Sequence, residues 1–338
     1  MRRDLQHARR GLPRITGVQI LATGSYAPPQ IVTNADLAQF GYDADWIVQR
    51  TGIHERRRAA DGVAASDLGC EAAARCLASA GATIGVVDLI IVATMTPDSP
   101  TPSTACQVQR RLGGQAAAFD VSAACAGFMV ALVTGMQFVK TGCARRVLVI
   151  GTDVMTRAVN PADRKTFPLF GDGAGAVLLG VGSDEQGFLS YVLGADGSGA
   201  DLLCTYGGGS REPLTAESIA AGRQYMRMDG RPVFKWAVNL LADSVRDVLA
   251  AAGLTASDLA LLVLHQANRR ILDAAAKALD IPAEKVIVNL DRYGNTSAGS
   301  IPLVLDELAQ AGRLRRGDHV LLSGFGAGLT WGTGVFRW

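Results

Sequence analysis

The chain has 338 residues, of which 49% are hydrophobic and 6% aromatic, and its formal net charge at neutral pH is +2. This length supports a large buried core, and the near-neutral charge implies no general polyanion-binding field, so we expect no nucleic-acid partner, with local basic patches as the open alternative. The six cysteines form neither a C-x-x-C pair nor a zinc-ligand spacing, which excludes those two site types.

The termini and apolar segments bear on location. Residues 1–14 are charged and lack the apolar region of a secretion signal, so we expect a disordered tail there. The longest apolar stretch is interrupted by Gln137 and Lys140, which argues against a membrane span. We therefore expect a cytoplasmic protein. An arginine-rich transit peptide is the alternative, which Asp4 disfavours.

The predicted elements alternate between strands and helices along the chain. In the first half we expect strands within residues 15–28, 87–94, 117–125, 145–154 and 175–180, and helices at 43–53, 65–81, 103–114 and 126–142. In the second half we expect helices at 233–254 and 269–280, strands at 258–268 and 318–328, and a strand, a polar turn and a helix within 286–312. Residues 182–226 are weakly patterned and are predicted to be strands and a loop that join the halves.

The order of elements in the second half repeats that of the first. Asp88 precedes Cys125 by the same number of positions as Asp258 precedes Asn295. This pattern indicates two related α/β halves. Ligands of such sheets gather where strands end and helices begin, so we expect the turns at Cys125, His265 and Asn295 to face one pocket.

Cys125 is the first candidate for chemistry. It lies in DVSAACAGF, after a predicted strand and at the start of a long apolar helix. A helix N-terminus stabilises anions, so we expect a lowered pKa and a reactive thiolate. The alternative is an ordinary buried cysteine like the other five.

His265 and Asn295 are the other candidates. His265 closes an apolar run and precedes Gln266, and Asn295 lies in the polar turn YGNTSAGS. The alternatives are a structural histidine at a strand end and an asparagine that only caps a helix. The coincidence of three such turns in a repeated architecture favours function. The glycine runs at 171–180 and 324–332 lack the helix and acidic strand end of a dinucleotide site.

Four segments in this order, DVSAACAGF, LHQAN, YGNTSAGS and SGFGAGLTWG, resemble the β-ketoacyl-[acyl-carrier-protein] synthase III family. WIVQRTGIHERR and GDGAGAV strengthen the resemblance, which covers about residues 15–338. The family implies a five-layered αβαβα thiolase fold built from two pseudo-repeated halves, here residues 15–180 with the nucleophile and 181–338 with the histidine and asparagine. It also implies a homodimer.

The resemblance implies a role for each matching residue. Cys125 would be the nucleophile, and His265 and Asn295 would complete the triad. The backbone N–H groups of Cys125 and Ala327 would form the oxyanion hole, although many relatives carry glycine at the latter position. The remaining implied residues are Phe325 and Asn268 beside the triad, Trp46, Arg50 and Arg164 for coenzyme A, and Arg270 for carrier-protein docking, with a solvated helix arginine as the alternative for Arg270.

The implied reaction joins an acyl-CoA starter to malonyl-acyl carrier protein with loss of CO₂, which initiates fatty acid synthesis and needs no metal or redox cofactor. Elongating ketosynthases use two histidines, and degradative thiolases need a second cysteine near the C-terminus, whereas the last cysteine here is Cys204. The alternatives are a relative in specialised metabolism that uses another acceptor and a non-catalytic partner subunit. The intact triad disfavours the second.

One position departs from several relatives. Thr101 stands where they carry a bulky phenylalanine that reaches the far end of the acyl pocket across the dimer. A smaller residue lengthens that pocket. We therefore expect tolerance of acyl groups longer than acetyl.

Overall fold

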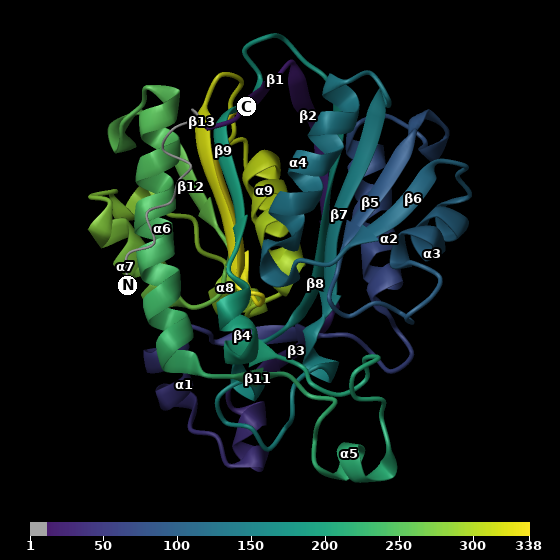
Figure 1. The fold of residues 1–338 in the computed structure, drawn as a ribbon, viewed down its shortest axis with the longest axis vertical. Coiled ribbons are helices and arrows are strands. Elements are labelled where there is room, and N and C mark those ends of the chain that lie inside the picture. Colours follow the sequence, from purple (N-terminus) through teal and green to yellow (C-terminus); the bar gives the residue numbers. More distant parts are fainter. Residues whose placement is uncertain (1–11) are drawn as a thin grey trace.

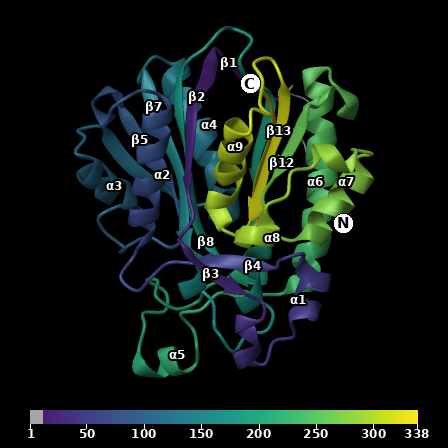
Figure 2. The same ribbon diagram turned by 180° about the vertical axis from the view of Figure 1, so that it is seen from behind.

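The computed structural model describes residues 12–338 and has five layers. Two sheets face each other across two central helices, and further helices cover the outer face of each sheet (Figures 1 and 2). The predicted αβαβα architecture is thus confirmed. Of the predicted tail, residues 1–11 lie outside the described residues, while Leu12 packs against a buried apolar cluster and the Pro13 carbonyl accepts a hydrogen bond from Tyr191 N at 3.0 Å.

The first sheet comes entirely from the first half of the chain. Within residues 12–338 its strand order is β2–β8–β7–β5–β6. These strands are β2 (Val18–Tyr26), β5 (Leu89–Ala93), β6 (Ala117–Val121), β7 (Arg146–Val154) and β8 (Asp172–Val181), and α2 (Ala65–Ser79) and α3 (Thr104–Leu112) cover the outer face. β5 pairs in parallel with β6 and β7, and all five of its residues are buried and apolar, as expected for a strand covered on both faces.

The second sheet has the order β1–β9–β14–β13–β12 within the described chain. Its strands are β1 (Ile15–Thr16), β9 (Gly187–Ala195), β12 (Leu261–Leu264), β13 (His319–Gly326) and β14 (Thr330–Arg337), and α6 (Gly230–Ala252) and α7 (Arg269–Ala278) cover its outer face. β1 pairs antiparallel with β9, so the beginning of the described chain belongs to the second sheet.

Smaller elements lie at the end of the molecule where the site is found. They are the hairpin β3 (Gln30–Thr33) and β4 (Glu55–Arg58), the pair β10 (Leu203–Cys204) and β11 (Arg227–Met228), and the short helices α1 (Ala44–Thr51), α5 (Ala216–Ala220) and α8 (Leu290–Tyr293). α1 begins where the Asp43 side chain accepts a hydrogen bond from Trp46 N, and it ends at Gly52, whose φ of 76° is left-handed.

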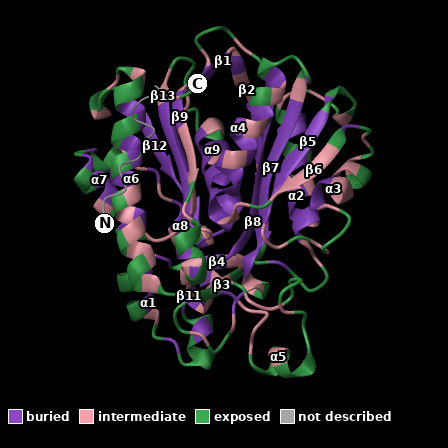
Figure 3. Ribbon diagram, in the orientation of Figure 1, coloured by how far each residue is buried: buried purple, intermediate pink, exposed green. Residues whose placement is uncertain are grey.

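The two central helices form the middle layer. α4 (Gly127–Lys140) and α9 (Ser300–Gln310) are largely buried between the sheets (Figure 3). Each follows a single turn of 3₁₀-helix, at Ala124–Ala126 before α4 and at Ser297–Gly299 before α9. The repeated order of elements in the sequence therefore corresponds to two equivalent turns at the centre of the molecule.

The strand predicted at the start of 286–312 is wrong in all but one pairing. Val286 forms an isolated bridge with Leu262, and no ladder follows it within the described residues. Beyond this bridge the backbone bonds to a side chain and not to a strand: Asn289 N donates to Gln266 Oε1 at 3.0 Å.

Residues 12–338 contain no helix that is long and apolar enough to cross a bilayer.

Candidate active site

Cys125 lies in the turn between β6 and α4. Cys125 is 7% exposed, and the end of β13 lies directly against its backbone. A Cβ added at Gly326 would lie 2.8 Å from Cys125 N, closer than such atoms approach in proteins, so only glycine fits there. The sequence run GFGAG is therefore explained by this close approach and not by a nucleotide.

The electrostatics of Cys125 differ from the prediction. Burial raises the pKa of the Cys125 thiol to about 12, which outweighs the lowering by the neighbouring Ser297 hydroxyl. The expected low pKa is thus not found in the resting enzyme. The thiol is neutral at rest, so its proton must leave during the reaction.

His265 follows β12 and is almost completely enclosed, with 1% exposure. Its backbone N–H donates to Ser323 O at 2.8 Å, which extends the pairing with β13. Its Nδ1 lies 2.8 Å from Ser300 Oγ, and its ring meets Phe325 edge-on with centroids 5.3 Å apart. Burial lowers the pKa of His265 to about 3. The imidazole is therefore neutral at physiological pH.

Asn295 lies in the turn after α8, and both of its backbone groups are bonded. Its N–H donates to Leu169 O at 2.8 Å, and its carbonyl accepts from Gly171 N at 3.1 Å. The side-chain Oδ1 accepts the Ser297 N–H at 2.8 Å, as in a cap. The amide nitrogen, which can only donate, is the other end of this group. Capping and a donor role are thus compatible in one side chain.

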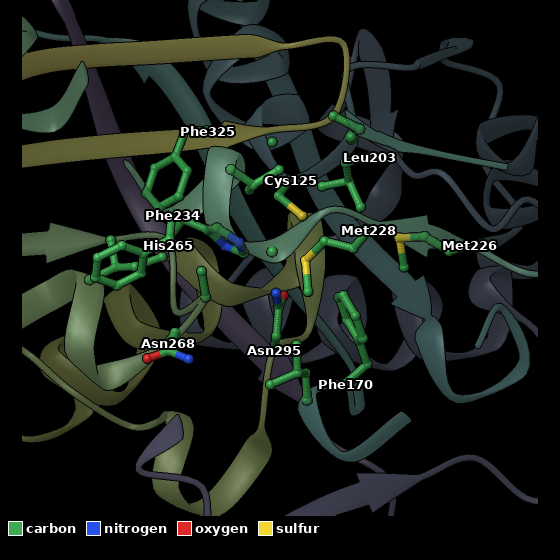
Figure 4. Close-up of a pocket in the computed structure, with 18 of the residues that line it drawn as sticks. Cys125, Phe170, Leu203, Met226, Met228, Phe234, His265, Asn268, Asn295 and Phe325 are labelled. Atoms are coloured by element: carbon green, nitrogen blue, oxygen red, sulfur yellow. The ribbon is translucent and has the colours of Figure 1, made fainter. Parts of the chain in front are cut away.

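The three side chains line one cavity of about 110 Å³ and point into it from three turns (Figure 4). Ala327, Phe325 and Asn268 also line it. Its remaining wall is mostly apolar and includes Met95, Phe170, Leu203, Met226, Met228, Val233 and Phe234. A thioester held here would meet a thiol, an imidazole and an amide while its acyl group contacts apolar side chains.

A second cavity adjoins the first, and arginine and lysine side chains line it. It is lined by Trp46, Arg50, Arg164, Lys165, Arg231 and Arg270, and it shares Leu169, Met228, Gly230, Phe234 and Asn268 with the first. Trp46 is 43% exposed, and the Arg50 guanidinium lies 5.9 Å from its ring centroid. We call this region the cationic mouth. It offers an exposed aromatic face and cations beside the entrance to the triad.

Two other predicted residues have different surroundings. Asn268 caps α7, since its Oδ1 accepts from Arg270 N at 2.9 Å and its Nδ2 donates to Arg50 O at 3.1 Å. It therefore ties the cationic mouth to the end of β12. Thr101 is exposed and lies in neither cavity.

Sequence reasoning missed three residues around the triad: Asp153, Ser297 and Ser300. Asp153 is fully buried at the end of β7, and its carboxylate accepts from Met95 N at 2.8 Å and from Ala298 N at 3.1 Å. Burial raises its pKa. The signal in the sequence was an acid at the end of the apolar run VLVIGTD, because a buried carboxylate needs a built set of donors.

Within residues 12–338, no group of three or more histidine, cysteine, aspartate or glutamate side chains could hold a metal ion.

The chain is similar in sequence to β-ketoacyl-[acyl-carrier-protein] synthase III of Rhodopirellula baltica, with 56% identity over 96% of this chain and 99% of that protein. It is 49% identical to the synthase III of Roseiflexus castenholzii over 94% of this chain and 97% of that one.

The fold matches solved structures equally well. The crystal structure of 3-oxoacyl-[acyl-carrier-protein] synthase III from Aquifex aeolicus superposes with a TM-score of 0.88 at 42% identity, covering 95% of this chain and all of that one. Two family models match, the 3-oxoacyl-[acyl-carrier-protein] synthase III model at residues 119–197 and its C-terminal model at residues 249–338. The predicted resemblance is confirmed, and the chain belongs to the 3-oxoacyl-[acyl-carrier-protein] synthase III family of condensing acyltransferases.

Proposed function

We propose that this chain joins an acyl-CoA starter to malonyl-acyl carrier protein with loss of CO₂, and so initiates fatty acid synthesis. The observation that carries the proposal is the convergence of Cys125, His265 and Asn295 on one cavity. Relatives at about half identity or more carry the synthase III name, which favours this reaction over the alternative in specialised metabolism.

Acylation of Cys125 is the first half-reaction. The sulfur attacks the thioester carbonyl, a new C–S bond forms, the bond to coenzyme A breaks, and the thiol proton ends on the released coenzyme A. The backbone N–H groups of Cys125 and Ala327 stabilise the tetrahedral oxyanion, and loss of one such donor costs about 100- to 1,000-fold in rate. Because the resting thiol is neutral, proton removal is coupled to the attack.

Condensation is the second half-reaction. The thioester oxygen of malonyl-carrier protein accepts hydrogen bonds from His265 and Asn295, the bond to CO₂ breaks, and its electron pair becomes an enolate. The enolate carbon then attacks the acyl group on Cys125, the C–S bond breaks, and the sulfur leaves as a thiolate that takes a proton from solvent to restore the neutral thiol. A neutral imidazole and an amide suit this step because it needs two donors and no base.

The cationic mouth fits both thioester carriers. We assign Trp46 and Arg164 to the adenine of coenzyme A, with Arg50 beside them, and Arg270 to docking of the carrier protein. The reaction needs no cofactor beyond the coenzyme A thioester that serves as substrate. The functional unit would be a cytoplasmic homodimer in which Thr101 of each protomer extends the acyl pocket of the other, so that starters longer than acetyl are accepted.

The test is intact-protein mass spectrometry after incubation with acyl-CoAs of increasing chain length, followed by a CO₂-release assay with malonyl-carrier protein. We expect one acyl adduct on Cys125, and Cys125→Ala should lose condensation by about 1,000-fold or more. Cys143→Ala, at an exposed thiol, is the matched control and should behave as wild type. Absence of an adduct on wild-type enzyme would favour a non-catalytic partner, and a strict acetyl preference would refute the role of Thr101.

A further inference from the structure

We propose that Ser300 is a positioning residue that holds the His265 imidazole in the tautomer with its proton on Nε2. The inference rests on the proposed role of His265 as a hydrogen-bond donor to the thioester oxygen. A neutral imidazole donates from only one nitrogen, so the enzyme must place that proton toward the substrate.

The geometry brings a hydroxyl to the other ring nitrogen. Ser300 is the first residue of α9 and is 2% exposed. Its Oγ lies 2.8 Å from His265 Nδ1 and 3.5 Å from the backbone nitrogen of Gln266. The first distance is that of a good hydrogen bond and the second is a long one.

The direction of these bonds follows from what each group can do. The Gln266 N–H can only donate, so it directs its hydrogen to a lone pair of the Ser300 oxygen. The hydroxyl hydrogen then remains for another acceptor, and within residues 12–338 the only acceptor in reach is His265 Nδ1. A nitrogen that accepts a hydrogen bond carries no proton. The proton of the neutral ring is therefore on Nε2.

The surroundings of the pair are rigid and uncharged. Gln266 is itself fixed, because its Nε2 donates to Leu264 O at 2.8 Å and to Ile287 O at 3.1 Å. The His265 ring is held from the side by Phe325. Within the described chain no carboxylate bonds the ring, and burial keeps it neutral. Ser300 is thus the group that decides between the two tautomers.

One segment consequently presets both donors. The backbone of Ser297 fixes which end of the Asn295 amide donates, and the hydroxyl of Ser300 fixes which end of the imidazole donates. Such supports keep catalytic groups in place before the substrate binds, so that no reorganisation is needed in the transition state.

The experiment reads the tautomer directly. Enzyme labelled with ¹⁵N at histidine is measured by long-range ¹H–¹⁵N correlation, with His265→Gln identifying the signal. We expect wild type to show only the Nε2–H form, and Ser300→Ala to show a mixture. Ser300→Thr keeps the hydroxyl and should keep the wild-type form. Ser190→Ala removes another buried hydroxyl, which lies on β9 of the second sheet and donates to Val248 O of α6, and is the matched control.

The kinetic signature separates positioning from a general structural effect. We expect Ser300→Ala to acylate Cys125 at the wild-type rate and to lose about tenfold in malonyl decarboxylation, the size of one hydrogen bond. An Nδ1–H form in wild type, or Ser300→Ala with the wild-type tautomer, overturns the inference. Failure of the proposed function looks different: His265→Ala, which removes the donor, would then condense normally, whatever the tautomer of the wild-type ring.

Discussion

The turns that precede α4 and α9 have the same backbone form in the two halves of the molecule. Each is a single 3₁₀ turn that opens with a non-glycine residue in the left-handed region, Ala124 with φ 47° and Ser297 with φ 52°. The first turn lines the cavity with Ala124 and Cys125, and from the other half Asn295, two residues before the second turn, lines it too. The turn in the first half carries Cys125, whereas the turn in the second half carries no nucleophile.

The side chains of the second turn serve other groups instead. Asn295, just before the turn, is oriented by the Ser297 N–H, and Ser300, just after it, bonds His265. The comparison indicates that one architecture presents a reacting atom in one half and donors in the other. Changes to the donor side chains His265 and Asn295 should therefore leave the first half-reaction intact.

The largest expected effect comes from removing a donor. His265→Ala and Asn295→Ala should each slow decarboxylative condensation by about 100- to 1,000-fold, because the enolate oxygen loses one of its two donors. Both variants should still acquire an acyl group on Cys125, since the donors of that step are backbone groups. Single-turnover acylation and CO₂ release, measured on the same preparations, test this. Equal losses in both half-reactions would contradict the division of labour between the turns.

The second prediction concerns the pH dependence of stability. Burial shifts the pKa of His265 in the second half downward and that of Cys125 in the first half upward. The pKa of His265 is lowered to about 3, so the stability gained by keeping it neutral is complete above its ordinary pKa of about 6.5. That stability is lost as pH falls toward 3, with a slope of about 1.4 kcal/mol per pH unit. Urea unfolding of wild type and His265→Gln between pH 7 and pH 4 measures it, and the variant should lack this part of the slope.

Cys125 should determine the alkaline side of the curve of stability against pH, as His265 determines the acid side. Its pKa is raised to about 12, so the stability due to the protonated thiol is complete below the ordinary thiol pKa of about 8.5 and is lost as pH rises toward 12. Cys125→Ala should flatten the alkaline limb and leave the acid limb unchanged. Identical pH dependence of both variants and wild type would show that burial does not control these two groups.

The fold and the triad were predictable because their signals are local. The buried strand LIIVA and the apolar helix after Cys125 follow directly from hydrophobic patterns, and the end of a strand located His265. Asn295 was found from the polar turn YGNTSAGS, although the strand expected before that turn forms only an isolated bridge. The glycine-rich β14 was not predicted, since its five buried residues include two glycines that fill space between strands without a hydrophobic pattern.

The environment of the site depended on contacts distant in sequence. The bond from Ser300 to His265 joins residues 35 positions apart, and that from Ala298 to Asp153 joins residues 145 apart. The pKa of Cys125 was predicted with the wrong sign because a helix N-terminus is visible in sequence, whereas enclosure by β13 and the second turn is not.

The smallest expected effect concerns the left-handed residue of the first turn. Alanine in that region is less favourable than glycine by about 1–2 kcal/mol, whereas glycine loses about 0.5–1 kcal/mol on ordering. Ala124→Gly should therefore raise the free energy of unfolding by between about 0 and 1.5 kcal/mol. Ala126→Gly is the matched control: its backbone is right-handed and its methyl fully buried, so it should destabilise by about 1–2 kcal/mol.

Urea unfolding of both variants tests why position 124 is alanine: either the left-handed backbone costs nothing here, or the methyl group has a role that offsets that cost. If Ala124→Gly destabilises as much as Ala126→Gly, the left-handed backbone carries no cost at this turn. If Ala124→Gly is more stable than wild type, the methyl is kept for another reason. Ala124 lines the cavity beside Cys125, so the loss of its methyl should then appear as slower acylation.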